Sequence, residues 1–82
     1  MSFENIIVTG CGGDIGISIG RILKISNVSN RVIGCDINEE HGGSAFFDVF
    51  EIVERADSRF YIERMLNVCK KYSVDLIIPT SE

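Results

Sequence analysis

The sequence predicts an α/β fold of the Rossmann-like kind, in which a parallel sheet of about four strands lies between helices. Two observations support this fold class. Short continuous apolar runs alternate with segments of helical period, and a glycine-rich turn separates the first run from the first helical segment. Continuous apolarity is typical of strands that are buried on both faces. We therefore expect a three-layer sandwich with strand order 3-2-1-4 and one helix on each face of the sheet.

The expected elements follow one another with short turns. Strands are predicted at residues 6–8, 32–36, 46–53 and 74–79, and helices at residues 15–26 and 58–72. In the first helix Ile15, Ile19, Ile22 and Ile25 or Ser26 recur at helical spacing and predict a buried stripe. Residues 37–45 have no period and contain two adjacent glycines, so we expect a loop there. Asp48 and Glu51 interrupt the third strand, which favours an edge position.

The second helix has its own start, stripe and end. Asp57 or Ser58 can cap its N-terminus, and Lys70 and Lys71 stand in its last turn, where the helix dipole favours positive charge. An apolar stripe is predicted along one side, made by Ile62, Met65, Leu66, Cys69 and Tyr72.

Length and composition limit the range of functions that the chain could have. A chain of 82 residues forms one domain, and 12 acidic against 8 basic side chains give a net charge of −4, which disfavours nucleic-acid binding. Apolar runs are too short to cross a membrane. Three cysteines at unrelated spacings predict reduced thiols and a cytoplasmic location. Enzymes of ordinary size need more chain, so we expect the natural protein to continue past Glu82, with residues 1–82 as one domain of it.

The last predicted strand supports the same expectation. Residues 74–79 would form an outer edge of apolar residues without a protecting lysine. Either further domains of the same protein cover this edge, or two copies of the chain pair through it as a homodimer. A domain that dimerises in this way and binds no small molecule is one of the functions that the sequence leaves open.

The glycine-rich turn is the most informative segment. Residues 9–16 read Thr-Gly-Cys-Gly-Gly-Asp-Ile-Gly, which places Gly10, Gly13 and Gly16 at the spacing of a dinucleotide-binding loop between a strand and a helix. Gly12 and Gly13 would let backbone N–H groups approach an anion at the helix N-terminus. The loop is either a working phosphate-binding turn or a tight turn kept for packing.

Two carboxylates near this turn have alternative roles. Asp36 follows Gly16 by 20 residues, which is the position of the acid that binds a ribose hydroxyl in dinucleotide domains. It could instead bind only loop N–H groups. Asp14 would lie close to a bound pyrophosphate, or it would cap the first helix and occupy the N–H groups that a phosphate needs.

The first 36 residues resemble a nicotinamide enzyme of the short-chain dehydrogenase type. That resemblance implies NAD(P) bound by Gly10, Gly13, Gly16 and Asp36. The catalytic Tyr-x-x-x-Lys of such enzymes is absent, because Met65 stands four residues after Tyr61 and Leu76 stands four residues after Tyr72.

The chain as a whole resembles a different family. The segments that carry this resemblance are residues 8–16, the Val-Ile-Gly-Cys-Asp of residues 32–36, Tyr-Ile-Glu at 61–63, Cys-Lys-Lys at 69–71, and the terminal Val-Asp-Leu-Ile-Ile-Pro-Thr-Ser-Glu. Together they resemble the N-terminal pre-ATP-grasp domain of ATP-grasp ligases, most of all proteins like the large subunit of carbamoyl phosphate synthase.

This resemblance implies ATP- and magnesium-dependent joining of a carboxylate to an amine or thiol through an acyl phosphate. It also implies that the residues for ATP and magnesium lie in later grasp domains, so no catalytic residue is expected in this segment. The matching substrate-side positions are Gly10 to Asp14 together with Thr80, Ser81 and Glu82. Glu82 could receive an amine, or it could be a solvated terminal residue.

A metal site is not expected. Cys11, Cys35 and His41 would lie near the ends of adjacent strands, but their spacing is not that of a zinc site and no fourth ligand is evident. Buried thiols and a solvated histidine explain these residues more simply.

Overall fold

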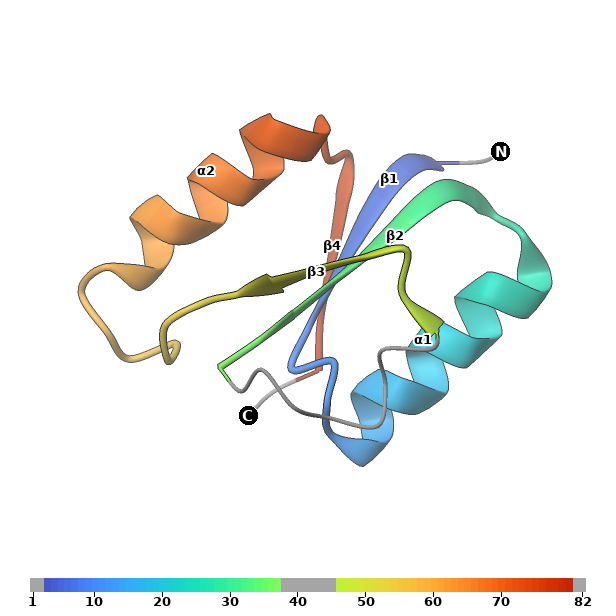
Figure 1. Ribbon diagram of the computed structural model, residues 1–82, viewed down its shortest axis with the longest axis horizontal. Coiled ribbons are helices and arrows are strands. Elements are labelled where there is room, and N and C mark those ends of the chain that lie inside the picture. The colour runs from blue at the N-terminus through green and yellow to red at the C-terminus, as the bar shows by residue number, and fades with distance from the viewer. Residues whose placement is uncertain (1–2, 38–45, 81–82) are drawn as a thin grey trace.

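A computed structural model describes residues 3–37 and 46–80 of the chain. It contains a four-stranded parallel sheet and two helices (Figure 1). In chain order the elements are β1 (Phe3–Thr9), α1 (Asp14–Ser26), β2 (Ser29–Asp36), β3 (Val49–Ile52), α2 (Tyr61–Tyr72) and β4 (Leu76–Pro79).

The strand order is β3-β2-β1-β4, and every neighbouring pair is parallel, as the sequence predicts. On one side β1 pairs with β2, with Ile7 opposite Ile33, and on the other it pairs with β4, with Ile7 opposite Ile77. The direction in which the chain moves across the sheet therefore reverses between β1 and β4. Ligands of open α/β sheets bind at such a reversal, beyond the carboxyl ends of the strands.

The core has two layers, one on each face of the sheet. On one face Ile7 and Ile33 pack with Met65 and Val68 of α2. On the other face Val8 and Val32 pack against the α1 side, where the partly buried Ile19 and Leu23 complete the layer. Because successive strand residues point to opposite faces, the continuous apolar run of β1 supplies both layers. The two helices therefore cover opposite faces, as predicted (Figure 1).

The third strand is shorter than the predicted range of residues 46–53. Phe46 and Phe47 precede β3, and Phe47 is buried against α1 and β2. A Cβ atom on Gly20 would lie 2.6 Å from the Phe47 ring, and one on Gly34 would lie 2.9 Å from it. These two glycines make room for the aromatic ring, so Phe47 serves the core rather than the sheet. The predicted edge position of this strand is confirmed.

The starts of the helices differ slightly from the prediction. Helix α1 begins at Asp14, and its N-cap is Gly13 with no side-chain cap, so Asp14 is not the cap. Helix α2 begins at Tyr61, three residues later than expected, with Phe60 as its N-cap and no side-chain cap. The Ser58 hydroxyl instead accepts the N–H of Phe60 in the preceding turn, so neither Asp57 nor Ser58 caps the helix.

The predicted helix stripes are only partly buried. Ile19 packs on the sheet, but Ile15, Ile22 and Ile25 lie on the outer side of α1 with 64%, 60% and 73% of their surface exposed. On α2, Met65 is buried, whereas Ile62 and Leu66 are exposed. Small residues, Gly16 and Gly20, occupy the inner side of α1, and this moves the larger isoleucines outward. The stripe of α2 is thus correct for Met65, Cys69 and Tyr72 and wrong for Ile62 and Leu66. The stripe of α1 was wrong except at Ile19, because a helix with apolar residues on several sides has no unique inner face.

The end of α1 and the length of both helices also bear on the predictions. Asn27, in the left-handed conformation with φ 55°, ends α1, in agreement with the helix end predicted at residue 26. Neither helix of the described ranges is long and apolar enough to cross a membrane.

Candidate functional site at the carboxyl edge of the sheet

The glycine loop connects β1 to α1 in a tight turn that depends on two glycines. Gly10 has φ 64°, a conformation that side chains disfavour, and its carbonyl accepts the N–H of Gly13 at 3.1 Å. A Cβ atom on Gly16 would lie 2.3 Å from the Gly10 carbonyl oxygen and 2.7 Å from Cα of Cys11. Gly16 thus lets the first turn of α1 lie directly on the loop. At Gly13, in contrast, a Cβ atom would make an ordinary contact at 3.6 Å.

Asp36, at the end of β2, holds this loop in place. Its Oδ2 accepts the N–H of Gly12 at 2.6 Å, and its Oδ1 accepts the N–H of Ile37 at 2.7 Å. The N–H of Cys11 also donates to the carbonyl of Cys35 at 3.1 Å, which extends the contact between loop and strand. Of the two roles considered for Asp36, the structure displays binding to loop N–H groups.

The first N–H groups of α1 make no hydrogen bond within the helix and are open to a bound anion. The N–H groups of Asp14 and Ile15 have no partner within the helix, as at every helix N-terminus, and both residues are exposed. The Gly12 and Gly13 N–H groups are already bound within the protein. An anion at this end of the molecule would therefore meet the first turn of α1 and also the negative charge of Asp14.

Thr80 joins β4 to the same loop. Its hydroxyl group donates to the carbonyl oxygens of Thr9 and Gly10, at 3.2 Å in the case of Gly10. The structure thus brings Thr80 together with Gly10, as the predicted strand order requires. Ser81 and Glu82 lie outside the described residues.

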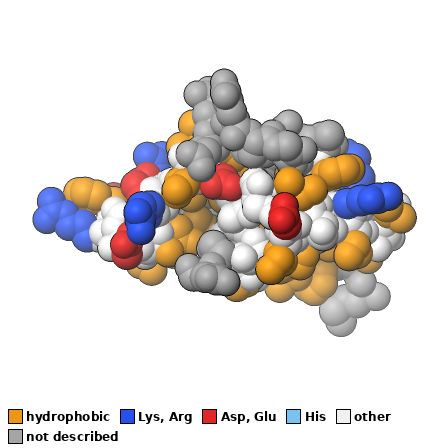
Figure 2. Space-filling model, turned by 90° about the horizontal axis from the view of Figure 1, so that it is seen from below, with side chains coloured by type: hydrophobic (Ala, Val, Ile, Leu, Met, Phe, Trp, Pro, Cys, Tyr) orange, Lys and Arg blue, Asp and Glu red, His pale blue; other side chains and the backbone are white. Residues whose placement is uncertain are grey.

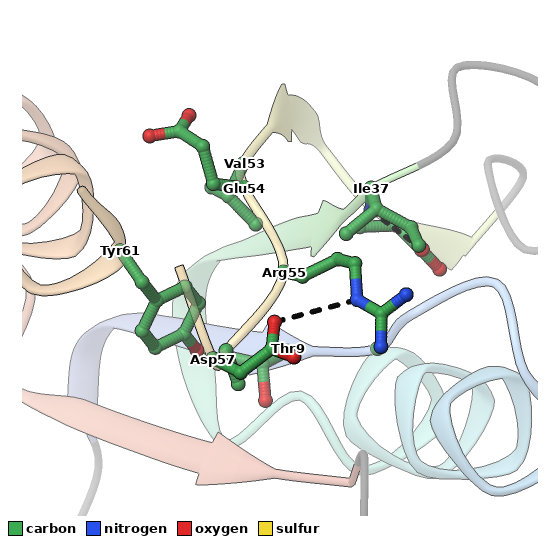
Figure 3. A pocket seen from close by; sticks show the side chains of 10 residues that line it. Thr9, Ile37, Val53, Glu54, Arg55, Asp57 and Tyr61 are labelled. Carbon is green, nitrogen blue, oxygen red and sulfur yellow. Dashed lines mark hydrogen bonds and ion pairs between the residues drawn. The ribbon is translucent and has the colours of Figure 1, made fainter. Parts of the chain in front are cut away.

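A pocket of about 380 Å³ opens beside the loop, between the ends of β1 and β2 and the segment that leads from β3 to α2. It is lined by Thr9, Gly10, Asp36, Ile37, residues 53–57 and Tyr61. Figure 3 shows Arg55 reaching toward Asp57, with which it forms an ion pair at 3.4 Å. The Glu54 side chain is turned away from them in the same view and pairs with Arg64 at 3.0 Å.

The pocket contains a polar atom without a partner. The Thr9 side chain is 4% exposed, and among the described residues no group hydrogen-bonds its hydroxyl oxygen. Buried hydroxyl groups are nearly always hydrogen-bonded, so this oxygen is an exception among the buried polar atoms of the described residues. Burial also raises the pKa of the Tyr61 phenol above its ordinary value of 10.

The cysteines are structural. Burial raises the pKa of the Cys11 thiol and of the Cys35 thiol to about 12, so both remain protonated at neutral pH. Within residues 3–37 and 46–80, no three His, Cys, Asp or Glu side chains come close enough to hold a metal ion. His41 lies outside the described residues.

Sequence reasoning located the glycine loop, Asp36 and Thr80 but missed the opposite wall of the pocket. Residues 53–57 and Tyr61 follow a short edge strand, and the sequence shows no motif there beyond the charged Glu-Arg-Ala-Asp run. The place of Thr9 in the wall of this pocket was also missed. The alternation of strand residues could have placed its side chain on the α2 face of β1, together with Ile7.

Comparisons with known proteins agree on the fold and divide on the function. No curated protein matches the chain. Among solved structures, L-threonine dehydrogenase from Clostridium difficile is similar, with 27% identity and a TM-score of 0.73. The match covers 96% of this chain but 24% of that enzyme, so the chain spans about a quarter of its length. The profile of the PylC-like N-terminal domain matches residues 6–82, and the chain belongs to this family of pre-grasp domains of ATP-grasp ligases.

Proposed function

We propose that this chain is the substrate-side domain of an ATP-dependent ligase, similar to the large subunit of carbamoyl phosphate synthase, and that it has no catalysis of its own. The family match over residues 6–82 carries this proposal. In the reaction, a carboxylate oxygen attacks the γ-phosphorus of ATP and ADP leaves. An amine or thiol then attacks the acyl phosphate carbon, and inorganic phosphate leaves. ATP and magnesium would be held by later domains of the protein.

The geometry supports a positioning role for the domain in this proposal. The first turn of α1 offers N–H groups to a substrate carboxylate or phosphate, and Thr80 ties the end of β4 to the loop beneath that turn. A substrate held there would lie at the reversal point of the sheet, between α1 and the residues after β4. In this proposal Gly10, Gly12, Gly13, Asp14 and Gly16 would contact the substrate from the side of the loop and α1, and Thr80 from the side of β4. Ser81 and Glu82, which lie outside the described residues, belong to the same proposed set.

Steady-state kinetics of the natural polypeptide that contains this chain test the proposal. Thr80→Val is expected to raise the KM for the acceptor about tenfold, because it releases the loop, and to leave the KM for ATP unchanged. Thr80→Ser keeps the hydroxyl group and should behave like the unchanged protein. Absence of ATP turnover with every carboxylate and amine offered would contradict the proposal.

NAD(P) binding is the alternative function. The likeness to a threonine dehydrogenase supports it, as do the positions of Gly10, Gly13, Gly16 and Asp36. Two observations weigh against it. Asp36 already binds Gly12, and neither tyrosine is followed by a lysine at the catalytic spacing. Titration of the chain with NADH, followed by fluorescence, distinguishes the two functions.

We propose that partner domains bind along β4, because this strand forms an edge of the sheet. Ile77 of this strand is 43% exposed, so the edge presents apolar surface. Other grasp domains of the same protein would cover it in a ligase, and a second copy would do so in a homodimer. Sedimentation of the chain at increasing concentration separates these cases, because only the homodimer forms from this chain alone.

A further inference from the structure

The apolar pattern of β4 does not fix the register of this strand on β1. Its sequence is Leu-Ile-Ile-Pro, and its residues are alternately half-buried and exposed. A shift of one residue would turn every side chain to the other face, and either face would still receive leucine or isoleucine. As the edge strand β4 pairs with β1 alone. Another group must therefore specify which residues lie opposite each other.

Asp75, the residue before β4, binds β1 at three points. Its Oδ1 accepts the N–H of Asn5 at 2.9 Å, and its Oδ2 accepts the N–H of Glu4 at 3.0 Å. Its own N–H donates to the Asn5 carbonyl at 3.1 Å. The hydrogen bonds from Asn5 and Glu4 hold the pKa of the Asp75 carboxyl below its ordinary value, so the acceptor is charged at neutral pH.

Asn5 is itself fixed in the sheet. It is 7% exposed, and its side chain binds two further segments. The amide nitrogen Nδ2 donates to the carbonyl of Ser73 at 3.3 Å, in the turn before β4, and Oδ1 accepts an N–H of Arg31 on β2 at 3.0 Å. A shift of β4 by one residue would break the bonds of Asp75 and of Ser73 together.

The opposite end of β4 is bound by Thr80, whose hydroxyl group donates to the carbonyl oxygens of Thr9 and Gly10. Figure 1 shows β4 running from the end of α2 to the edge of the sheet where the glycine loop lies. Figure 2 views that edge, where acidic side chains lie near the middle and Lys and Arg nearer the two ends. Asp75 and Thr80 are roughly 16 Å apart along an extended strand. Asp75 is therefore too far away to contact a substrate beside the loop.

We propose that Asp75 is a positioning residue, which fixes the register of β4 on β1 and thereby places Thr80 beside the glycine loop. The inference rests on the proposed ligase function, which assigns the crevice between α1 and the end of β4 to the substrate. In the observed register Pro79 lies opposite Thr9, and Thr80 reaches Gly10. A shift of one residue would move the Thr80 hydroxyl by about 3.3 Å, and it would no longer donate to the same two carbonyl groups.

The other edge strand offers a matched control. Asp48 stands directly before β3, as Asp75 stands before β4. Its Oδ2 accepts the N–H of Val32 at 2.8 Å, its own N–H donates to the Val32 carbonyl at 2.9 Å, and its Oδ1 pairs with Lys24 at 3.6 Å. Asp48→Ala and Asp75→Ala thus remove the same kind of bond at opposite edges of the sheet. Only Asp75→Ala should disturb Thr80.

NMR spectra of the chain test the register without ATP. In the unchanged chain we expect side-chain NOEs between Ile7 and Ile77, which lie opposite each other. Asp75→Ala should weaken these NOEs or move them by one residue, and should shift the Gly10 amide. Asp75→Asn keeps the side-chain size and one acceptor oxygen, so it should retain the fold and cause smaller changes of the same kind. Asp48→Ala should leave the NOEs and the Gly10 shift unchanged.

The proposal is wrong if the folded Asp75 variants keep the NOEs and the Gly10 shift of the unchanged chain. It is also wrong if Asp48→Ala changes them as much as Asp75→Ala does, because a general loss of stability would then explain the effect.

Steady-state kinetics of the natural polypeptide test the consequence for the substrate. Asp75→Ala should raise the KM for the acceptor about tenfold, as Thr80→Val should, and leave the KM for ATP unchanged. If Asp75 acts through Thr80, the double variant should resemble Thr80→Val alone. Effects that multiply would contradict the proposal, as would an equal rise of this KM in Asp48→Ala. Absence of ligase activity would refute the proposed function and leave the register measurements as they stand.

Discussion

Gly12 donates its backbone N–H to Oδ2 of Asp36 at 2.6 Å, and this bond ties the glycine loop to the end of β2. In dinucleotide domains an acid at this position serves the ribose, and loop N–H groups approach the pyrophosphate. Here the acid and the loop bind each other. The residue pattern of a dinucleotide-binding loop is thus also compatible with a loop whose Gly12 N–H is bound by Asp36 of the same chain.

Asp36→Asn is expected to destabilise the chain by about 1.5–3 kcal/mol, because two N–H groups lose a charged acceptor. Urea unfolding followed by circular dichroism measures the change. Asp57→Asn provides the control, since the Asp57 side chain is 75% exposed in a surface ion pair and its replacement should cost less than about 1 kcal/mol. Equal losses in the two variants would show that Asp36 does not hold the loop.

Gly16→Ala should be far more disruptive than Gly13→Ala. The added methyl group at position 16 would lie 2.3 Å from the Gly10 carbonyl oxygen, so the backbone must shift at a cost of about 2–3 kcal/mol. At position 13 the methyl group meets an ordinary contact at 3.6 Å, and the change should stay within about 1 kcal/mol. Thermal unfolding of both variants decides the matter, and similar melting temperatures would refute the packing role of Gly16.

Glu51 should make stability depend on pH at the acid side. Hydrogen bonds from the phenol of Tyr72 and from Lys71 hold the pKa of its carboxyl below the ordinary 4.5. The unfolded chain therefore binds more protons near that pH, and the stabilising contribution, present above pH 4.5, is lost as pH falls through the lower folded pKa.

Glu51→Gln should accordingly flatten the rise of unfolding free energy with pH on this acid limb. Glu63→Gln, on the exposed side of α2, serves as the control and should leave the slope as it is in the unchanged chain. Urea titrations at a series of acid pH values give the slopes. An unchanged slope in Glu51→Gln would contradict the assignment.

The thiols should react in a fixed order with a disulfide reagent. Cys11 and Cys35 are fully buried, each with a pKa of about 12, so both should be inert in the folded chain. Cys69 is partly exposed, although burial raises its pKa as well, and it should react slowly. Mass spectrometry after brief labelling is expected to find modification at Cys69 first, and all three thiols after unfolding in urea. Early labelling of Cys35 would contradict the core described above.

The sheet could be predicted from the sequence because its strands are continuous apolar runs with short connections. Strand order followed from the alternation of strands and helices together with the right-handed crossover. The inner faces of the helices could not be predicted, because Gly16 and Gly20 pack inward while the larger Ile15, Ile22 and Ile25 are exposed. Periodicity counts apolar residues and gives small residues too little weight where backbones approach closely.

The candidate site also has a part that the sequence predicts and a part that it does not. Gly10, Gly16 and Asp36 belong to a local motif with known spacing, so their proximity was predictable. Thr9 and the Arg55–Asp57 pair line the same pocket although they are more than 40 residues apart in the sequence. A segment without a period, such as residues 53–57, gives no sequence signal for the wall it forms.

The most direct test of the central proposal is a search for an acyl phosphate made by the natural polypeptide that contains this chain. The polypeptide would be incubated with ATP, magnesium and candidate carboxylates, and hydroxylamine would trap the activated acyl group as a hydroxamate. We expect hydroxamate and ADP to form in equal amounts, and neither to form without a carboxylate. Saturable NADH binding without any ATP-dependent hydroxamate would contradict the ligase assignment and favour a dinucleotide-binding protein.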